Sequence, residues 1–174
     1  MSARSVLVVV EHDRGVMADA AGEALTAGRA LAAAGGGGGL AALTIGAAAD
    51  GLVEELAAFG VDVVHQVHHD VLADYGPEAW GAVVAAATAA LEPVVVMATG
   101  TDRGNEVLAQ AAARLDVAFV ANCTAVELGD PVTVTRVRWG GSLLEEATLT
   151  GAPTLLTMAH HAVAAVAADS LGAA

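Results

Sequence analysis

The stretch PVVVMATGTDRGNEVLAQAAARL, residues Pro93–Leu115, decides the fold class. Val94–Ala98 is a short apolar run rich in β-branched residues, which predicts a buried strand. Thr99–Asp102 then supplies turn residues and side-chain oxygens that can cap a helix, and Arg103–Leu115 places apolar side chains at helical spacing. A buried strand, a tight turn and an amphipathic helix in this order are typical of an α/β fold, which binds ligands at such turns.

Apolar runs and helical patterns alternate on both sides of this stretch. The predicted strands are Ser5–Val10, Leu40–Ile45, Val61–Val67, Val94–Ala98 and Ala118–Val120. The predicted helices are Asp19–Ala33, Gly51–Phe59, Glu78–Leu91 and Arg103–Leu115. Such alternation predicts a three-layer α/β/α, Rossmann-like domain whose parallel sheet core has the strand order 3-2-1-4-5.

The pattern changes after Asn122, where short strands follow one another across turns rich in glycine and proline. These predicted strands are Cys123–Leu128, Val132–Arg138, Leu143–Leu149 and Thr154–Met158. We expect them to form an antiparallel C-terminal extension of the sheet. The domain is expected to cover residues 1–158, followed by a tail over residues 159–174 that fits either a short helix or disorder.

Charge and composition exclude several classes of function. The 174 residues carry a formal net charge of −13 and contain no lysine, which argues against binding nucleic acid. The single cysteine excludes an intramolecular disulfide, and the amino terminus lacks a signal-peptide core, so a cytoplasmic location is expected. The most apolar window, Ala79–Thr101, is interrupted by Glu92 and Pro93, so we expect a helix and a strand there and no membrane span.

Two turns at the expected carboxyl edge of the sheet are the candidate nucleotide or anion crevice. The candidate residues follow the first and fourth strands: Glu11, His12, Thr99, Gly100, Thr101, Gly104 and Asn105. Amides at a helix start and threonine hydroxyls could hold a phosphate or a carboxylate there. The acidic side chains of these turns, among them Glu11 and Asp102, count against a dianion.

Other residues that could suggest a binding or metal site are better interpreted as structural or solvent-exposed. The glycine run Gly35–Gly39 precedes the second strand, so it lies at the amino edge and is expected to be a connector. His65, His68 and His69 lack metal-site spacing, and His160-His161 is expected to be a solvated tail. Nothing in the sequence has the spacing of a catalytic constellation, so no enzyme and no metal are expected.

Several segments, in this order, resemble one family. They are Val6–His12, Glu23–Leu31, Ala98–Ala118, Asn122–Val126 and Arg138–Gly141. Together they resemble the amino-terminal domain of the electron transfer flavoprotein alpha subunit, which has an adenine-nucleotide alpha-hydrolase-like fold. The resemblance runs from about Val6 to Met158, so the chain would stop before the family's carboxy-terminal FAD domain.

The resemblance implies a scaffold that pairs with a beta-type subunit in an FAD-containing electron carrier. FAD would be held by the assembled complex, mostly through the domain that follows. Acyl-CoA or other flavin dehydrogenases would be partners through the complex, and the isolated domain could form a homo-oligomer. The alternative is a stand-alone adenine-nucleotide-binding, stress-protein-like domain, to which AMP would bind by analogy of fold.

Overall fold

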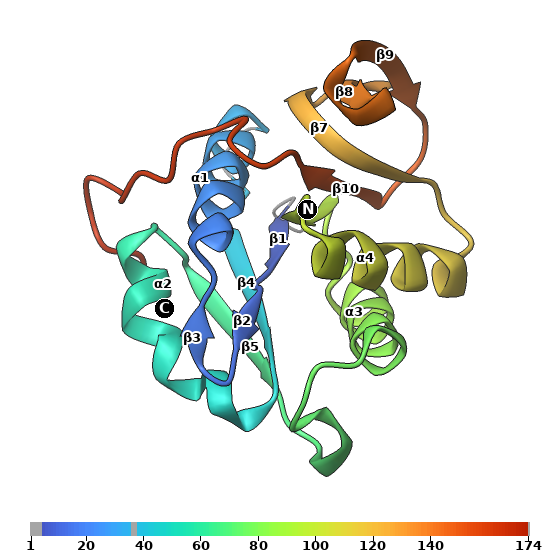
Figure 1. Ribbon diagram of the computed structural model, residues 1–174. Coiled ribbons are helices and arrows are strands. Elements are labelled where there is room, and N and C mark those ends of the chain that lie inside the picture. The colour runs from blue at the N-terminus through green and yellow to red at the C-terminus, as the bar shows by residue number, and fades with distance from the viewer. Residues whose placement is uncertain (1–4, 36–37, 174) are drawn as a thin grey trace.

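The structure is a computed structural model that describes residues 5–35 and 38–173. A mixed sheet lies between two layers of helices, which confirms the predicted three-layer α/β/α class (Figure 1). Part of the predicted connector Gly35–Gly39, residues 36–37, lies outside the described residues.

Among the described residues, the main sheet has eight strands in the order β5-β4-β1-β6-β10-β7-β8-β9. They are β1 (Val6–Val9), β4 (Leu40–Ile45), β5 (Val63–Val67), β6 (Val95–Thr99), β7 (Phe119–Glu127), β8 (Val132–Arg138), β9 (Leu143–Leu149) and β10 (Thr154–Met158). A small hairpin of β2 (His12–Asp13) and β3 (Val16–Met17) follows β1. The parallel order predicted for the first four strands is confirmed, because β5, β4, β1 and β6 are neighbours in that order.

The strand Thr154–Met158 corrects the prediction for the C-terminal extension. We expected an antiparallel strand, but β10 inserts between β6 and β7 and pairs parallel to both. It is fully buried, as a central parallel strand should be, because helices cover both of its faces. The predicted fifth strand is also longer than expected, since β7 continues through a bulge near Asn122 into the extension.

Helices cover the two faces of the sheet in pairs. The helical elements are α1 (Asp19–Ala34), η1 (Ala47–Leu52), α2 (Val53–Ala58), η2 (Asp70–Leu72), α3 (Pro77–Leu91), α4 (Asp102–Leu115) and η3 (Trp139–Gly141). The predicted helix Gly51–Phe59 is therefore a 3-10 turn followed by a shorter α-helix. No described helix combines the length and the apolar character that crossing a bilayer would need.

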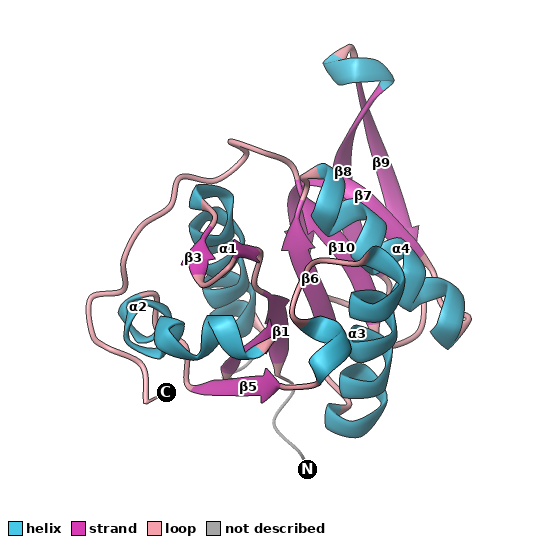
Figure 2. Ribbon diagram, turned by 60° about the horizontal axis from the view of Figure 1, so that its bottom comes forward, coloured by secondary structure: helices cyan, strands magenta, loops and turns pink. Residues whose placement is uncertain are grey.

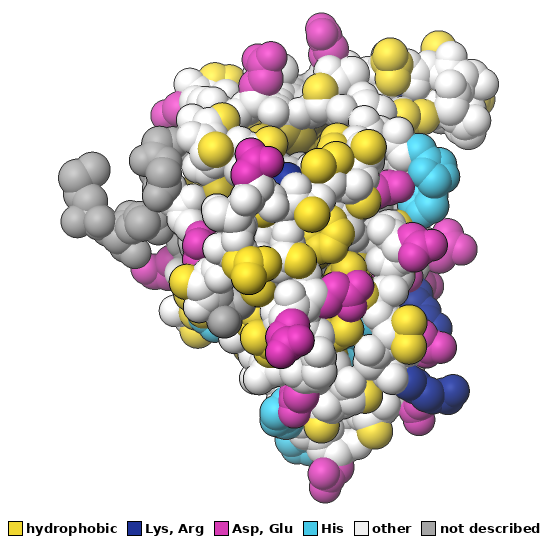
Figure 3. Space-filling view, turned by 90° about the vertical axis from the view of Figure 1, so that its left-hand side faces the viewer, with side chains coloured by type: hydrophobic (Ala, Val, Ile, Leu, Met, Phe, Trp, Pro, Cys, Tyr) yellow, Lys and Arg dark blue, Asp and Glu magenta, His cyan; other side chains and the backbone are white. Residues whose placement is uncertain are grey.

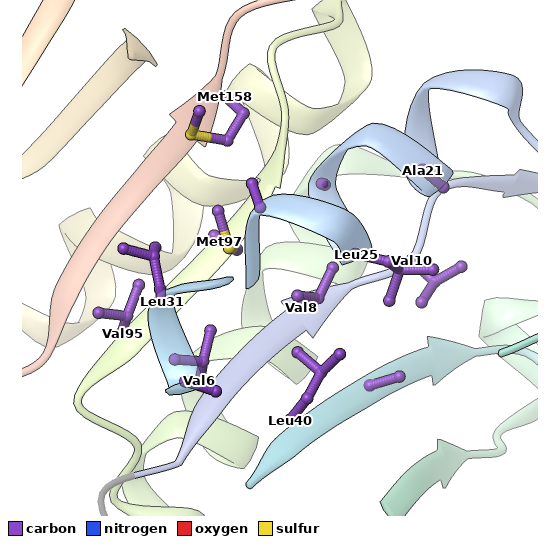
Figure 4. Close-up of a cluster of buried hydrophobic side chains, with 14 of the residues drawn as sticks. Val6, Val8, Val10, Ala21, Leu25, Leu31, Leu40, Val95, Met97 and Met158 are labelled. Carbon is purple, nitrogen blue, oxygen red and sulfur yellow. The ribbon is translucent and has the colours of Figure 1, made fainter. Parts of the chain in front are cut away.

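The alternation of side chains along β1 divides the core into two clusters. Val6 and Val8 point toward α1 and α2, whereas Leu7 and Val9 point toward α3 and α4. Figure 4 shows the first cluster, where small residues of α1 allow the helix to lie close to β1, β4 and β6. Small residues thus replace aromatic bulk in a chain whose residues are only 3% aromatic.

Beyond β7, the antiparallel strands β8 and β9 project from the body of the domain, which confirms the antiparallel part of the extension (Figure 2). In this antiparallel pair, Val132 lies opposite Leu149 at one end and Arg138 lies opposite Leu143 at the other. All seven residues of β9 are exposed or only partly buried. The hairpin is therefore a protruding arm on an otherwise compact core.

The C-terminal segment, residues 159–173, contains neither helix nor strand. It crosses α1 and then reaches α2, where the amides of Ala168 and Gly172 donate to Ala58 and Ala57 (Figure 1). On α1, the Arg29 guanidinium donates both to Phe59 O at 2.7 Å and to Val166 O at 3.0 Å. The segment is thus held against the α1–α2 layer by hydrogen bonds, an arrangement that neither of the two expected alternatives describes.

Candidate functional site

The two candidate turns lie next to each other, as predicted. β1 and β6 are paired in parallel, so the turns that follow them leave the same edge of the sheet. The order β4-β1-β6 makes this the point where the chain switches direction across the sheet. Ligands of open α/β sheets bind at such a point.

The carboxylate of Glu11 occupies the position that an anion would take in this crevice. Thr99 Oγ1 donates to Glu11 Oε2 at 2.9 Å, and Thr101 Oγ1 donates to the same oxygen. Thr101 is the N-cap of α4 and accepts from Gly104 N at 3.0 Å. Because Thr101 donates its hydroxyl hydrogen bond to Glu11, the lone pairs of that hydroxyl are free to accept from the helix amide. The turn therefore supplies its own anion.

The two candidate glycines of this turn allow backbone segments to approach closely. A Cβ on Gly104 would lie 2.0 Å from Thr99 O, so only glycine lets α4 start this close to the end of β6. A Cβ on Gly100 would lie 2.6 Å from Met158 O, on the neighbouring strand β10. Both glycines have a packing role that is sufficient to explain their presence.

Asn105 points away from Glu11 and belongs to a different network. Thr157 Oγ1 donates to Asn105 Oδ1 at 2.7 Å and accepts from Asn122 N at 2.9 Å. Asn105 Nδ2 also donates to Asn122 Oδ1 at 3.4 Å. The network joins α4, β7 and β10. Sequence reasoning missed Asn122 and Thr157, because their role depends on the insertion of β10 between β6 and β7.

His12 is a buried structural residue. Its Nε2 lies 2.8 Å from Ile45 O, and its Nδ1 lies 3.4 Å from the amide of Gly15. A carbonyl on one side and an N–H on the other favour the tautomer with the proton on Nε2. The ring also lies against Trp80, with 5.3 Å between centroids. His12 thus ties the turn after β1 to β4 and α3.

Aromatic and charged side chains close the crevice over Glu11. Tyr75 meets Trp80 edge to face with 5.3 Å between ring centroids, and the Arg103 guanidinium lies 4.6 Å from the centre of the Tyr75 ring. The space left between these groups is about 10 Å³, which is roughly the room that one water molecule needs. That space is too small for a nucleotide.

Tyr75 is held in its neutral form. Burial raises the pKa of Tyr75 to about 12, and a hydrogen bond to Glu106 acts in the same direction. In that bond Tyr75 Oη donates to Glu106 Oε2 at 3.1 Å. The lid over the crevice is therefore a neutral phenol between an acidic and a basic side chain.

Residues 6–174 match the family model of the electron transfer flavoprotein domain. The chain belongs to this family.

Curated relatives of this electron transfer flavoprotein domain carry related names. The domain is 26% identical over 143 residues to "Electron transfer flavoprotein subunit alpha" of Thermoanaerobacterium thermosaccharolyticum, covering 81% of this chain and 43% of that protein. It is 28% identical over 148 residues to "Protein FixB" of Bradyrhizobium diazoefficiens, covering 82% of this chain and 40% of that protein. The chain thus spans about two fifths of the length of these relatives.

The histidines near β5 turn to separate partners within the electron transfer flavoprotein domain. His68 Nε2 lies 2.7 Å from Asp50 Oδ1, and His69 Nδ1 accepts from Val71 N at 3.2 Å. Neither belongs to a group of metal-ligating side chains among the residues that the structure describes. His68 and His69 are thus held by different hydrogen-bond partners.

The tip of the β8–β9 hairpin is the most prominent apolar surface of the electron transfer flavoprotein domain near the extension. Trp139 is 80% exposed, Leu144 is 71% exposed and Leu143 is 54% exposed. The same hairpin carries Arg136 and Arg138, which both contact Glu145. Large apolar side chains that are rimmed by charges are typical of surfaces that bind another protein.

The charged side chains on the face beside α2 are mostly acidic. Figure 3 shows the face that carries α2 and the C-terminal segment, where acidic groups are scattered among apolar ones and basic groups are few. A surface of this kind offers no basic stripe for a phosphate backbone.

Proposed function

We propose that this chain is the non-catalytic amino-terminal domain of an electron transfer flavoprotein alpha subunit and acts as a scaffold in an FAD-containing electron carrier. The match to the family over residues 6–174 is the observation that carries the proposal. The names of the relatives support the alpha-type assignment. In this role the domain positions other parts of the assembly and takes no direct part in electron transfer.

The closed crevice supports a scaffold role over cofactor binding. FAD and AMP are both far larger than the space of about 10 Å³ beneath Tyr75 and Arg103. The carboxylate of Glu11 would also repel a phosphate at the start of α4. We therefore assign FAD to the assembled complex, held mostly outside this chain.

The proposed partner is a beta-type subunit, which would bind the tip of the β8–β9 hairpin. Trp139, Leu143 and Leu144 are exposed there, and burying such side chains stabilises a complex by roughly 25 cal/mol per Å² of apolar area. Tryptophan is also a frequent energetic centre of protein interfaces. Through this complex the domain would serve acyl-CoA or other flavin dehydrogenases.

Sedimentation of this chain mixed with the beta-type subunit of the same genome tests the pairing. We expect a one-to-one complex, and we expect Trp139→Ser with Leu144→Ser to weaken it at least about tenfold. Val71→Ser is the matched control, because Val71 is 69% exposed but lies on η2, away from the hairpin. A chain that stays monomeric in the mixture, or a hairpin variant that binds like the control, would refute this assignment.

The alternative, an adenine nucleotide bound to this chain, requires Glu11 to leave the start of α4. Calorimetry with AMP separates the two roles, because the scaffold role predicts no saturable heat. Glu11→Gln removes the negative charge but keeps an oxygen that can accept from Thr99 and Thr101. Saturable AMP binding that strengthens in Glu11→Gln would favour the nucleotide-binding role.

A further inference from the structure

Three metal-ligating side chains meet where the C-terminal segment crosses α1. Glu23 belongs to the early part of α1, and His160 and His161 follow the end of β10. The carboxylate of Glu23 is only 14% exposed, whereas the imidazole of His161 is 79% exposed. The group therefore combines a mostly buried carboxylate with two solvent-exposed imidazoles.

Direct contacts hold the group together. The amide of His161 donates to Glu23 Oε2 at 2.8 Å, and His161 Nδ1 lies 3.1 Å from Glu23 Oε1. His160 Nδ1 lies 3.1 Å from His161 Nε2, with 4.2 Å between the ring centroids. The amide contact fixes one carboxylate oxygen, and the other faces the imidazole of His161.

The donor set has the chemistry of a zinc site. One ligand atom from each of the three side chains lies within 4.8 Å of the others. Tetrahedral zinc with bonds of about 2.0–2.2 Å requires ligand atoms that are roughly 3.3–3.6 Å apart. His161 faces Glu23 through Nδ1 and His160 through Nε2, so a zinc ion bound at Nδ1 requires the His160 side chain to rotate toward it. Two imidazoles and one carboxylate are also a known zinc ligand set, with a fourth position left for water. The net charge of −13 adds a general attraction for a cation.

We propose that Glu23, His160 and His161 form a zinc site that fastens the C-terminal segment to α1. The same face of α1 already contacts this segment at Thr26 and Arg29, which follow Glu23 at intervals of one helical turn. Thr26 Oγ1 accepts from Val166 N at 3.0 Å, and Arg29 donates to Val166 O at 3.0 Å. The metal adds a third connection, at the point where the segment leaves β10.

Calorimetric titration of the metal-free protein with zinc chloride tests the site. We expect one zinc per chain and, at zinc concentrations about a hundredfold above Kd, a Tm raised by roughly 5–10 °C. His160→Ala, His161→Ala and Glu23→Gln should each weaken binding at least about tenfold. Cobalt should give the absorption bands of a tetrahedral complex in place of zinc.

The double variant His68→Ala, His69→Ala is the matched control, because it removes the same number of exposed imidazoles elsewhere. It should bind zinc like the unchanged chain. Circular dichroism checks that every variant is folded. The absence of saturable zinc binding, or unchanged binding in the His160→Ala, His161→Ala double variant, would overturn the proposal.

Amide hydrogen exchange distinguishes zinc binding alone from zinc binding that also holds the C-terminal segment against α1. Zinc should slow exchange in residues 160–173 of the unchanged chain and leave exchange in Glu23→Gln as it is without metal. If zinc binds to the three side chains without slowing exchange in this segment, the fastening is refuted. This result does not depend on the proposed pairing with a beta-type subunit, since it is measured on the chain alone.

Discussion

Gly104→Ala tests the close approach of α4 to the end of β6. The added Cβ would lie 2.0 Å from Thr99 O, and an ordinary contact needs about 3.4 Å. β6 cannot yield, because all of its residues are buried. The start of α4 must therefore move outward, which lengthens the bond from Gly104 N to the cap at Thr101.

The expected cost follows from three effects. Overpacking costs about 1–3 kcal/mol, and loss of the N-cap costs about 1 kcal/mol. The higher helix propensity of alanine returns up to about 1 kcal/mol. We therefore expect the free energy of unfolding to fall by about 2 kcal/mol, which is a large part of the roughly 5–15 kcal/mol that stabilises a typical domain.

Urea unfolding followed by circular dichroism measures this effect. The midpoint should fall by roughly 1 M, given typical urea m-values of about 1–3 kcal/mol/M. Gly51→Ala is the matched control, because nothing lies within 4 Å of the position that a Cβ would take there, and its effect should be neutral or slightly stabilising. If the free energies of unfolding of Gly104→Ala and of this control differ by less than about 0.5 kcal/mol, the close contact with Thr99 O does not require glycine at position 104.

Further measurements address the lid, the core thiol and the C-terminal segment. Tyr75 is the only tyrosine of the chain, so the absorbance of tyrosinate should show a pKa of about 12, and Glu106→Gln should lower it by removing the negative charge beside the phenol. Stability from this shift is complete below the unfolded pKa of about 10 and is lost as the pH rises from there through about 12. A normal pKa of about 10 for Tyr75 in the folded protein would contradict the closed lid. Burial raises the pKa of the single cysteine, Cys123, to about 12, so a thiol reagent should modify it only after unfolding, and rapid modification of the native protein would argue against its burial. Arg29→Ala should speed amide exchange near Val166 without changing the exchange of β1, since it removes the bonds to Phe59 O and Val166 O, and an unchanged rate would show that other contacts hold the segment.

Local patterns were sufficient to predict the elements around the crevice. A cap within the turn Thr99–Asp102, the helix that follows it and the neighbouring positions of β1 and β6 all follow from short-range signals and the rules for parallel sheets. Which group occupies the crevice could not be predicted in this way. Whether the Glu11 carboxylate turns toward Thr99 or toward solvent depends on its rotamer and on the side chains that close over it.

The direction of β10 was beyond sequence reasoning for a different reason. Thr154–Met158 is a short apolar run between turns, and such a run has the same pattern in a parallel and in an antiparallel strand. The group of Glu23, His160 and His161 was equally inaccessible, because its members are far apart in the chain and meet only when the segment after β10 crosses α1. Long-range placement, and not local conformation, separates what could be predicted from what could not.

The place of β10 also bears on how the chain is completed during synthesis. β6 and β7 are joined in the sheet only through β10, which the ribosome makes after the whole β8–β9 hairpin. Until residues 154–158 emerge from the exit tunnel, the nascent sheet ends in an open parallel edge at β6, and the hairpin has no place to dock. Such an edge can capture another strand, so the interval before β10 arrives is when a nascent chain of this topology most needs a chaperone.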